Sequence, residues 1–392
     1  MNIIRVFGLV SAALMLVPLT CGKAALKSAP KAACAAISSS GRSGAASLAA
    51  KNLNLEIIDP SGHSTTLSAP LQTEGDECRA VFDHKGNLLA VAIRKQFDST
   101  QGLRILIADT EVPEWVANFS VEPQAGLQAP LSLVGFLQDT ESLVVQGSGE
   151  KTAKATATIV GTIVVDTAGK VLSAAPFKRT LEGRAPSFTD AMHNRLWYLS
   201  SPHFCPIRSV TLTGNLMQGP DVASLPNERS YCLPNVVGYP DSDTLVLAAT
   251  MSDSDAVWRI DLGAGTGERI AAPRDRFPKG DQIDGNGSLS PDGQVFAFAR
   301  HQFSYGRFDN FSYMGSDIVV VQVRPLRLLG VILPGDDLYQ HEFAADHRDG
   351  KTSVLVFSSG VWKKLWVEPS KSSEHSAMAP NNGRLPSTPT TH

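Results

Sequence analysis

The sequence has no long hydrophobic run and no excess of one charge. Its longest apolar stretch, residues 6–19, has about 14 residues, fewer than the roughly 20 that a helix needs to cross a bilayer. We therefore expect no transmembrane segment. The 392 residues include 35 Lys and Arg against 38 Asp and Glu, a net charge of −3, and no basic stripe is present. This balance argues against a nucleic-acid partner.

The same apolar stretch is typical of an export signal. Arg5 precedes it, and residues 22–24 offer small side chains for cleavage. We interpret residues 1–24 as a signal peptide, so the mature protein is expected to be periplasmic or extracellular. A lipid anchor on Cys21 is the alternative, but residues 18–20 lack the small residue that normally precedes such a cysteine.

Two further segments have the composition of flexible chain. Residues 25–50 are rich in Ala, Ser, Gly and Lys without a sustained period, which predicts a flexible lead-in. Residues 370–392 contain mostly Ser, Pro, Asn and Thr and too few apolar residues to offset the entropy of ordering, so we expect a disordered tail. Residues 51–369 between them are expected to form one domain.

This central region contains a repeat. Residues 288–300 read as a short strand, a Pro-Asp-Gly turn and a second apolar strand, and the pattern of strand, Asp-containing turn and strand recurs. The turn aspartates are spaced by 56, 51, 51, 51 and 54 residues. They are Asp83, Asp139, Asp190, Asp241, Asp292 and Asp346.

A second pair of strands follows each first pair, so each unit has four strands. A period near 50 residues with four strands predicts an all-β fold, a β-propeller. The N-terminal pair, within residues 53–67, looks like a second half without a first, whereas residues 342–358 look like a first half. We therefore expect six blades, with the N-terminal strands completing the last blade and closing the ring. Residues 361–367 are not used in this count and leave seven blades as the alternative.

The Ser-Pro-Asp-Gly turn and apolar strand of residues 290–298 resemble the repeat of TolB-like propellers. The Asp-x-x-Gly end at residues 166–169 is similar to those of WD-type repeats. The resemblance covers roughly residues 53–367, but only the fifth copy matches closely. It implies the architecture, and since such propellers include binding scaffolds, hydrolases and quinone-dependent enzymes, it does not imply an activity.

The loops that join the two halves of a blade, and those that join successive blades, are expected on one face of the propeller. These loops are long, and binding residues gather on such loops. The most distinctive one is residues 300–316, which combine aromatic residues with Arg, the types enriched at interface anchors. The alternative is that these aromatics cap the propeller core. The predicted binding surface consists of Arg300, His301, Phe303, Tyr305, Arg307, Phe308 and, on a neighbouring loop, His203.

Four cysteines remain after the expected cleavage, and four allow three pairings. Cys205 and Cys232 are expected on the rim of the same face, so we favour a disulfide between them. Cys34 with Cys78 is the second pairing, and it would tie the lead-in to the first blade. An exported protein occupies a compartment where disulfides persist.

No catalytic or cofactor motif is present. The sequence lacks a nucleophile elbow, a dinucleotide fingerprint and the spacings of a zinc site, so we predict no catalytic residue, no metal and no cofactor. Scattered polar residues of the same face offer the weak alternative of a metal or acid–base site: His203, His301, His341, Asp281, Asp284, Asp336 and Asp337.

The leading hypothesis is an exported binding or scaffold protein of the bacterial cell envelope, whose partner is a protein or another envelope component. Whether the chain is an enzyme stays open, and the lack of a catalytic constellation argues against it. A propeller hydrolase or lyase with a site in the axial channel is one alternative. A purely structural repeat domain is the other.

Overall fold

The computed structural model describes most of residues 32–367. The described ranges are 32–49, 51–71, 75–95, 102–124, 127–137, 141–148, 157–180, 187–190, 195–199, 207–211, 236–241, 243–250, 254–261, 264, 266–273, 281–305, 311–334, 342–358 and 360–367. They contain 26 β-strands and no helix. No described helix is therefore long and apolar enough to span a membrane. The predicted signal peptide and tail lie outside these ranges.

The strands form five four-stranded and two three-stranded antiparallel sheets among the described residues. The first three sheets are β1 (Ala32–Ile37), β2 (Ser43–Ala49), β3 (Asn52–Ile58) and β4 (Ser64–Pro70); β5 (Glu77–Phe82), β6 (Leu88–Arg94), β7 (Leu103–Asp109) and β8 (Glu114–Val121); and β9 (Gln128–Phe136), β10 (Leu143–Ser148), β11 (Ala157–Val165) and β12 (Val171–Thr180). The fourth and fifth are β13 (Ser187–Asp190), β14 (Arg195–Leu199) and β15 (Ile207–Thr211); and β16 (Val236–Asp241), β17 (Thr244–Thr250), β18 (Ser254–Asp261) and β19 (Thr266–Pro273). The last two are β20 (Asp281–Leu289), β21 (Val295–Tyr305), β22 (Phe311–Gln322) and β23 (Arg327–Ile332); and β24 (Phe343–Arg348), β25 (Lys351–Ser358) and β26 (Val361–Trp366).

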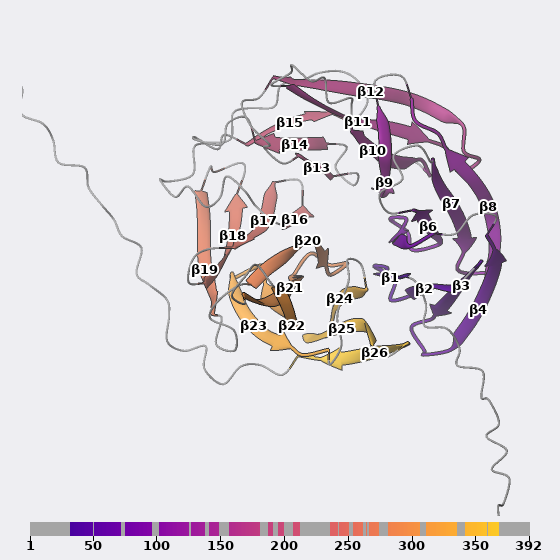
Figure 1. Cartoon of the computed structure of the whole chain (residues 1–392). Helices are drawn as coiled ribbons and strands as arrows, with labels where there is room; N and C mark the ends of the chain where they lie inside the picture. Colours follow the sequence, from indigo (N-terminus) through magenta and orange to yellow (C-terminus); the bar gives the residue numbers. More distant parts are fainter. Residues whose placement is uncertain are drawn as a thin grey trace, which may run out of the picture.

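Within every sheet the strands pair in chain order. Figure 1 shows the sheets arranged around a common centre, with the first strands, such as β1, β9, β16 and β24, toward the centre and the last strands at the rim. The predicted all-β, propeller-like architecture of four-stranded antiparallel sheets is thus found.

The N-terminal pairing differs from the prediction. Strand β3 pairs with β2 from Ser43↔Ile58 to Ala49↔Asn52, and β4 pairs with β3. These strands therefore belong to a complete first sheet and do not extend the sheet that contains β25. The predicted flexible lead-in supplies β1 and β2, so seven sheets are seen where six were expected.

Strands β1 and β2 escape a propensity-based prediction because they are built from Ala, Ser and Gly, residues that are not enriched in strands. Small side chains suit the space available. A Cβ placed on Gly44 would come within 2.2 Å of Leu89 in the second sheet.

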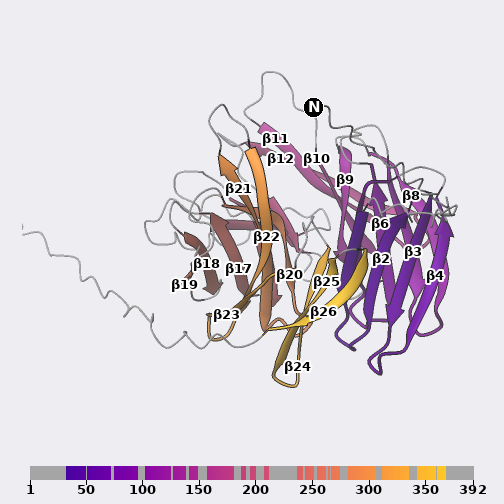
Figure 2. The same ribbon diagram turned by 60° about the horizontal axis from the view of Figure 1, so that its bottom comes forward.

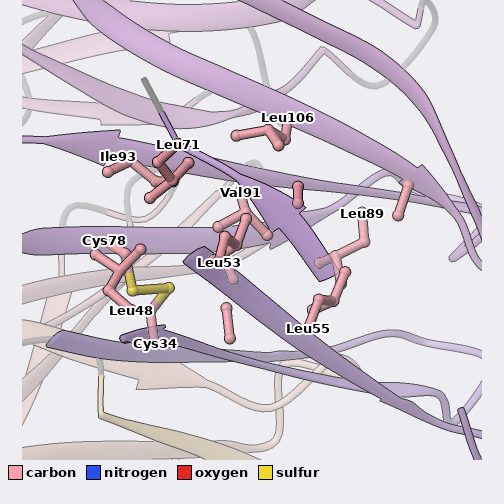
Figure 3. Close-up of a cluster of buried hydrophobic side chains, with 14 of the residues drawn as sticks. Cys34, Leu48, Leu53, Leu55, Leu71, Cys78, Leu89, Val91, Ile93 and Leu106 are labelled. Atoms are coloured by element: carbon pink, nitrogen blue, oxygen red, sulfur yellow. A yellow bond between two sulfur atoms is a disulfide. The ribbon is translucent and has the colours of Figure 1, made fainter. Parts of the chain in front are cut away.

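The first two sheets share one hydrophobic cluster, shown in Figure 3. It includes Leu48, Leu53 and Leu55 from the first sheet and Leu89 and Val91 from the second, all 1% exposed or less. A disulfide crosses the same interface from Cys34 in β1 to Cys78 in β5, with 5.7 Å between the Cα atoms. The second of the two pairings considered from sequence is therefore formed.

Three of the described repeat turns share one hydrogen-bond pattern. At Ser38, Asp83 and Ser290, the N–H of the glycine three residues later donates to the residue's carbonyl oxygen. The side-chain oxygen of each also accepts a backbone N–H from the far side of the turn. Serine thus replaces aspartate in the turn of the first sheet, so the spacing of turn aspartates does not reveal that sheet.

The last sheet packs on the first. Ala344 and Leu355 of the last sheet form a small cluster with Ala35 of β1, joined by Ile37 and Trp362 at its margin. Arg348 Nη2 also donates to the carbonyl oxygen of Ser38, at 3.2 Å. The two ends of the described chain therefore meet by side-chain packing, without a shared sheet.

Candidate functional site

The segment predicted as the binding loop is largely a long hairpin. Strands β21 and β22 have 11 and 12 residues and pair from Val295↔Gln322 to Tyr305↔Phe311. The pairing of β20 with β21 stops at Gln302, and that of β23 with β22 stops at Ile318. Beyond these points the described part of the sheet has only two strands. Figure 2 shows β21 and β22 reaching well past β23.

The composition of the hairpin changes along its length. At the end farthest from its tip, residues Val295 to Ala299 of β21 and Ile318 to Val321 of β22 are completely buried. Toward its tip the register places Phe303 opposite Tyr313 and Tyr305 opposite Phe311. Aromatic residues favour strands, which accounts for the continuation of pairing beyond the core.

A buried ion pair lies where the hairpin leaves the core. Arg300 and Asp317 are cross-strand partners, and both side chains are 3% exposed. Arg300 Nε donates to Asp317 Oδ1 at 2.8 Å, and Nη2 donates to Oδ2 at 2.7 Å. This two-pronged geometry is the strong form of the Arg–carboxylate interaction. Arg300, predicted as a surface binding residue, thus anchors the base of the hairpin.

The next cross-strand pair toward the tip is His301 with Ser316. His301 Nδ1 lies 2.8 Å from Ser316 Oγ in a hydrogen bond, and both residues are half-buried. Since successive residues of a strand point to opposite faces, the ion pair and the His–Ser pair fix the two faces of the hairpin at adjacent positions.

The structure describes only part of the predicted surface. Phe303 and Tyr305 lie in β21 beyond the ion pair. Asp281 and Asp284 lie in β20 of the same sheet. The remaining predicted residues lie outside the described ranges: Arg307, Phe308, His203, His341, Asp336 and Asp337, together with Cys205 and Cys232. Among the described residues, no group of three or more His, Cys, Asp or Glu is placed to hold a metal.

Asp317 and Ser316 were missed from sequence. The sequence does contain a signal for this ion pair, because Asp317 directly precedes a continuous apolar strand and Arg300 directly follows one. Pairing them requires the register of the hairpin, which the sequence does not specify without the length of the connecting turn.

The opposite face carries ion pairs that join neighbouring turns. Arg324 Nη2 lies 2.5 Å from Asp241 Oδ2 and links the β22–β23 turn to the end of β16. Partial burial acts to raise the pKa of Asp241, but the Asp243 N–H and the Arg324 guanidinium outweigh it and hold the pKa below its usual value. On the same face, Asp346 is contacted within its own sheet by Arg348 and Lys364. These charges are therefore engaged in contacts within the fold.

No family model and no curated protein matches the chain. Among solved structures, it is similar to an oligogalacturonate lyase in complex with manganese, at 11% identity and a TM-score of 0.47, over 87% of this chain and 91% of that one. It is also similar to TolB from Acinetobacter baumannii, at 14% identity and a TM-score of 0.34, over 82% and 77% of the two chains. A prolyl endopeptidase matches at 14% identity and a TM-score of 0.45 over 82% of this chain, which spans only 44% of that protein. The chain thus resembles TolB-like and related propellers.

Proposed function

We propose that this chain is an exported seven-bladed β-propeller that binds a protein or another component of the cell envelope. In this proposal the hairpin β21–β22 is the docking element, and the partner contacts Tyr305, which ends β21, and Arg307 and Phe308, which follow it in the sequence. The propeller begins at β1 and ends at β26.

A closed ring of seven blades is supported by the packing between successive sheets. Buried clusters join the first sheet to the second, the second to the third, the fifth to the sixth and the sixth to the seventh. The contact of the seventh with the first adds a fifth junction. Each sheet needs such neighbours because a single four-stranded sheet cannot bury both of its faces.

Export is supported by two independent features. The apolar residues 6–19 after Arg5 have the pattern of a signal peptide. The disulfide between Cys34 and Cys78 is of a kind that persists in oxidising compartments such as the periplasm.

The observation that carries the binding role is the hairpin itself. A two-stranded hairpin is only marginally stable in water, so its extension beyond β23 and beyond the described part of β20 has no evident benefit for the core. The buried pair of Arg300 and Asp317 fixes its base. A fixed base lowers the entropy lost on binding. The aromatic and Arg residues toward the tip are of the types that anchor interfaces.

Site-specific photo-crosslinking in intact cells tests the proposal. Phe308 is replaced by a benzoyl-phenylalanine crosslinker, and the control carries it in place of Trp366, an exposed aromatic on β26 with 58% exposure. We expect a discrete crosslinked species from position 308 and none from position 366. Equal crosslinking from both positions, or none from position 308, would argue against a docking hairpin.

A triple variant, Tyr305→Ala with Arg307→Ala and Phe308→Ala, separates docking from stability. We expect its melting temperature to match the parent and the crosslink from a probe at position 303 to disappear. A sharp loss of stability would instead assign these residues to the core, the alternative considered from sequence.

A further inference from the structure

A cluster of charges lies at the inner edge of the second sheet, away from the hairpin. Arg79 and Glu77 belong to β5, the first strand of that sheet, and Arg94 ends β6 beside them. Glu77 and Arg94 are cross-strand partners. Arg94 lies near the end of β6, the second strand of its sheet, and His301 lies at the corresponding position of β21, the second strand of the sixth sheet. The charge cluster therefore lies on the same face of the propeller as the hairpin.

The two faces of β5 are used differently. Cys78 and Ala80 are buried in the cluster shared with the first sheet. Since side chains alternate along a strand, Arg79 faces the other way, with Val81, which packs on the cluster shared with the third sheet. Arg79 therefore lies between the second and third sheets.

The carboxylate of Glu77 is already engaged by Arg94. Arg94 Nε donates to Glu77 Oε2 at 2.7 Å, and Nη2 donates to Oε1 at 2.6 Å. Arg94 Nη1 also donates to the carbonyl oxygen of Leu131 at 3.3 Å and to Ser132 Oγ at 3.1 Å in the third sheet. These contacts fix the guanidinium of Arg94 and occupy both oxygens of Glu77.

Among the described residues, Arg79 has no counterion of its own. Within the described ranges it makes no hydrogen bond and no ion pair, although it is half-buried. Burial lowers the pKa of Arg79 to about 10, and the nearby positive charge of Arg94 adds to this, while Glu77 opposes it. Two guanidinium groups facing one carboxylate leave one uncompensated positive charge. Placing such a charge in a partly dry site is costly unless an anion accompanies it.

We propose that Arg79 binds a small oxyanion, a carboxylate or phosphate group, at the inner edge between the second and third sheets. The planar guanidinium offers paired N–H donors that match the oxygens of either group. Arg94 adds positive charge from a fixed position, and Ser132, held by Arg94, supplies a hydroxyl from the third sheet. The ligand thereby joins two sheets and neutralises the cluster. This site is independent of the hairpin and of the binding role proposed for it.

Calorimetric titration of the full-length mature protein tests the site, with inorganic phosphate and malonate as separate probes in a chloride buffer. We expect saturable one-site binding of at least one probe, and the comparison of the two identifies the preferred oxyanion. Arg79→Gln should weaken that binding by about 10- to 100-fold, the range for a lost hydrogen bond to a charged group. Arg104→Gln is the matched control, because Arg104 lies in β7 of the same sheet and its Nε is bonded to Asn118.

Absence of saturable binding for both probes, or equal affinity of Arg79→Gln and the parent, would overturn the proposal. A second variant removes the charge but keeps the apolar stem, Arg79→Met. Without added anion we expect it to melt no lower than the parent, because an uncompensated charge is removed. With the preferred anion the parent should gain stability and Arg79→Met should not. A variant that melts lower without anion would show that Arg79 has a partner within the chain, which contradicts the site.

Discussion

The first sheet, β1–β4, and the sixth, β20–β23, have the same strand order and closely similar first turns but opposite compositions. The inner strands of the first sheet are largely Ala, Ser and Gly, with Leu48 as their one large buried side chain. The sixth buries Phe296 and Phe298 completely, together with the valines of β22. One backbone arrangement is therefore filled in two ways.

The difference shows where the stability of each sheet arises. Large apolar side chains give the sixth sheet much buried area, since fully burying one is worth about 1.5–3 kcal/mol. The inner strands of the first sheet bury less area per residue, and a disulfide ties β1 to the second sheet. The sixth sheet can accommodate a buried ion pair and a protruding hairpin on this firm base.

The largest effect is expected in the sixth sheet, from Asp317→Asn. It removes the charge of Asp317 from beside the buried Arg300 guanidinium, and breaking a buried pair in this way typically costs about 3–5 kcal/mol. Urea denaturation followed by tryptophan fluorescence measures the loss. The control is the double variant Arg300→Met with Asp317→Leu, which removes both charges and should recover most of the stability. Equal losses in the single and double variants would mean that the ion pair is not what anchors the sheet.

The next effect concerns the first sheet. Replacing both Cys34 and Cys78 by Ala opens a covalent loop between residues 44 positions apart, and such losses typically cost about 2–4 kcal/mol. Hydrogen exchange should show faster opening of β1 and β2 than of β20–β23. Substitution is preferable to a reducing agent, because Cys205 and Cys232 are also present in the chain. Uniform loss of protection over both sheets would mean that the first sheet does not depend on the disulfide more than the sixth.

This contrast also explains which parts of the fold the sequence predicts. The sixth sheet has a Pro-Asp-Gly turn followed by an apolar strand, and the sequence predicts both, although β21 continues to Tyr305 into residues expected to form a loop. The first sheet lacks these signals, because Ser38 replaces the turn aspartate and Ala-rich strands are held by packing and a disulfide between distant residues. Because the first sheet was not recognised from the sequence, β3 and β4 were wrongly expected to pair with the strands of residues 342–358. Even the turn residues were misaligned, since Ser290, and not Asp292, corresponds to Asp83 in its hydrogen bonds.

The candidate sites depend on register and on contacts between sheets, which a single sequence does not reveal. Residues 300–316 are unusual in sequence but predict a loop, because aromatic and polar residues alternate there without a clean turn signal. Arg300 was expected on the surface of that loop, and its buried position follows only from its pairing with Asp317. The sequence does not single out Arg79, because its uncompensated charge follows from the hydrogen bonds between Arg94 and the Glu77 carboxylate.

The smallest effect separates backbone strain from packing between sheets. Gly293 and Gly350 have almost the same backbone angle, φ of 69° and 70°, which disfavours any side chain. A Cβ on Gly350 meets nothing within 4 Å, whereas one on Gly293 comes within 2.8 Å of the Pro240 carbonyl oxygen in the fifth sheet. Gly350→Ala should therefore cost about 1 kcal/mol from strain alone. Gly293→Ala should cost at least about 1 kcal/mol more, because a backbone carbonyl cannot turn away as a side chain can. Urea denaturation of the two variants side by side measures this difference directly, and equal losses would show that the turns of the fifth and sixth sheets are not in tight contact.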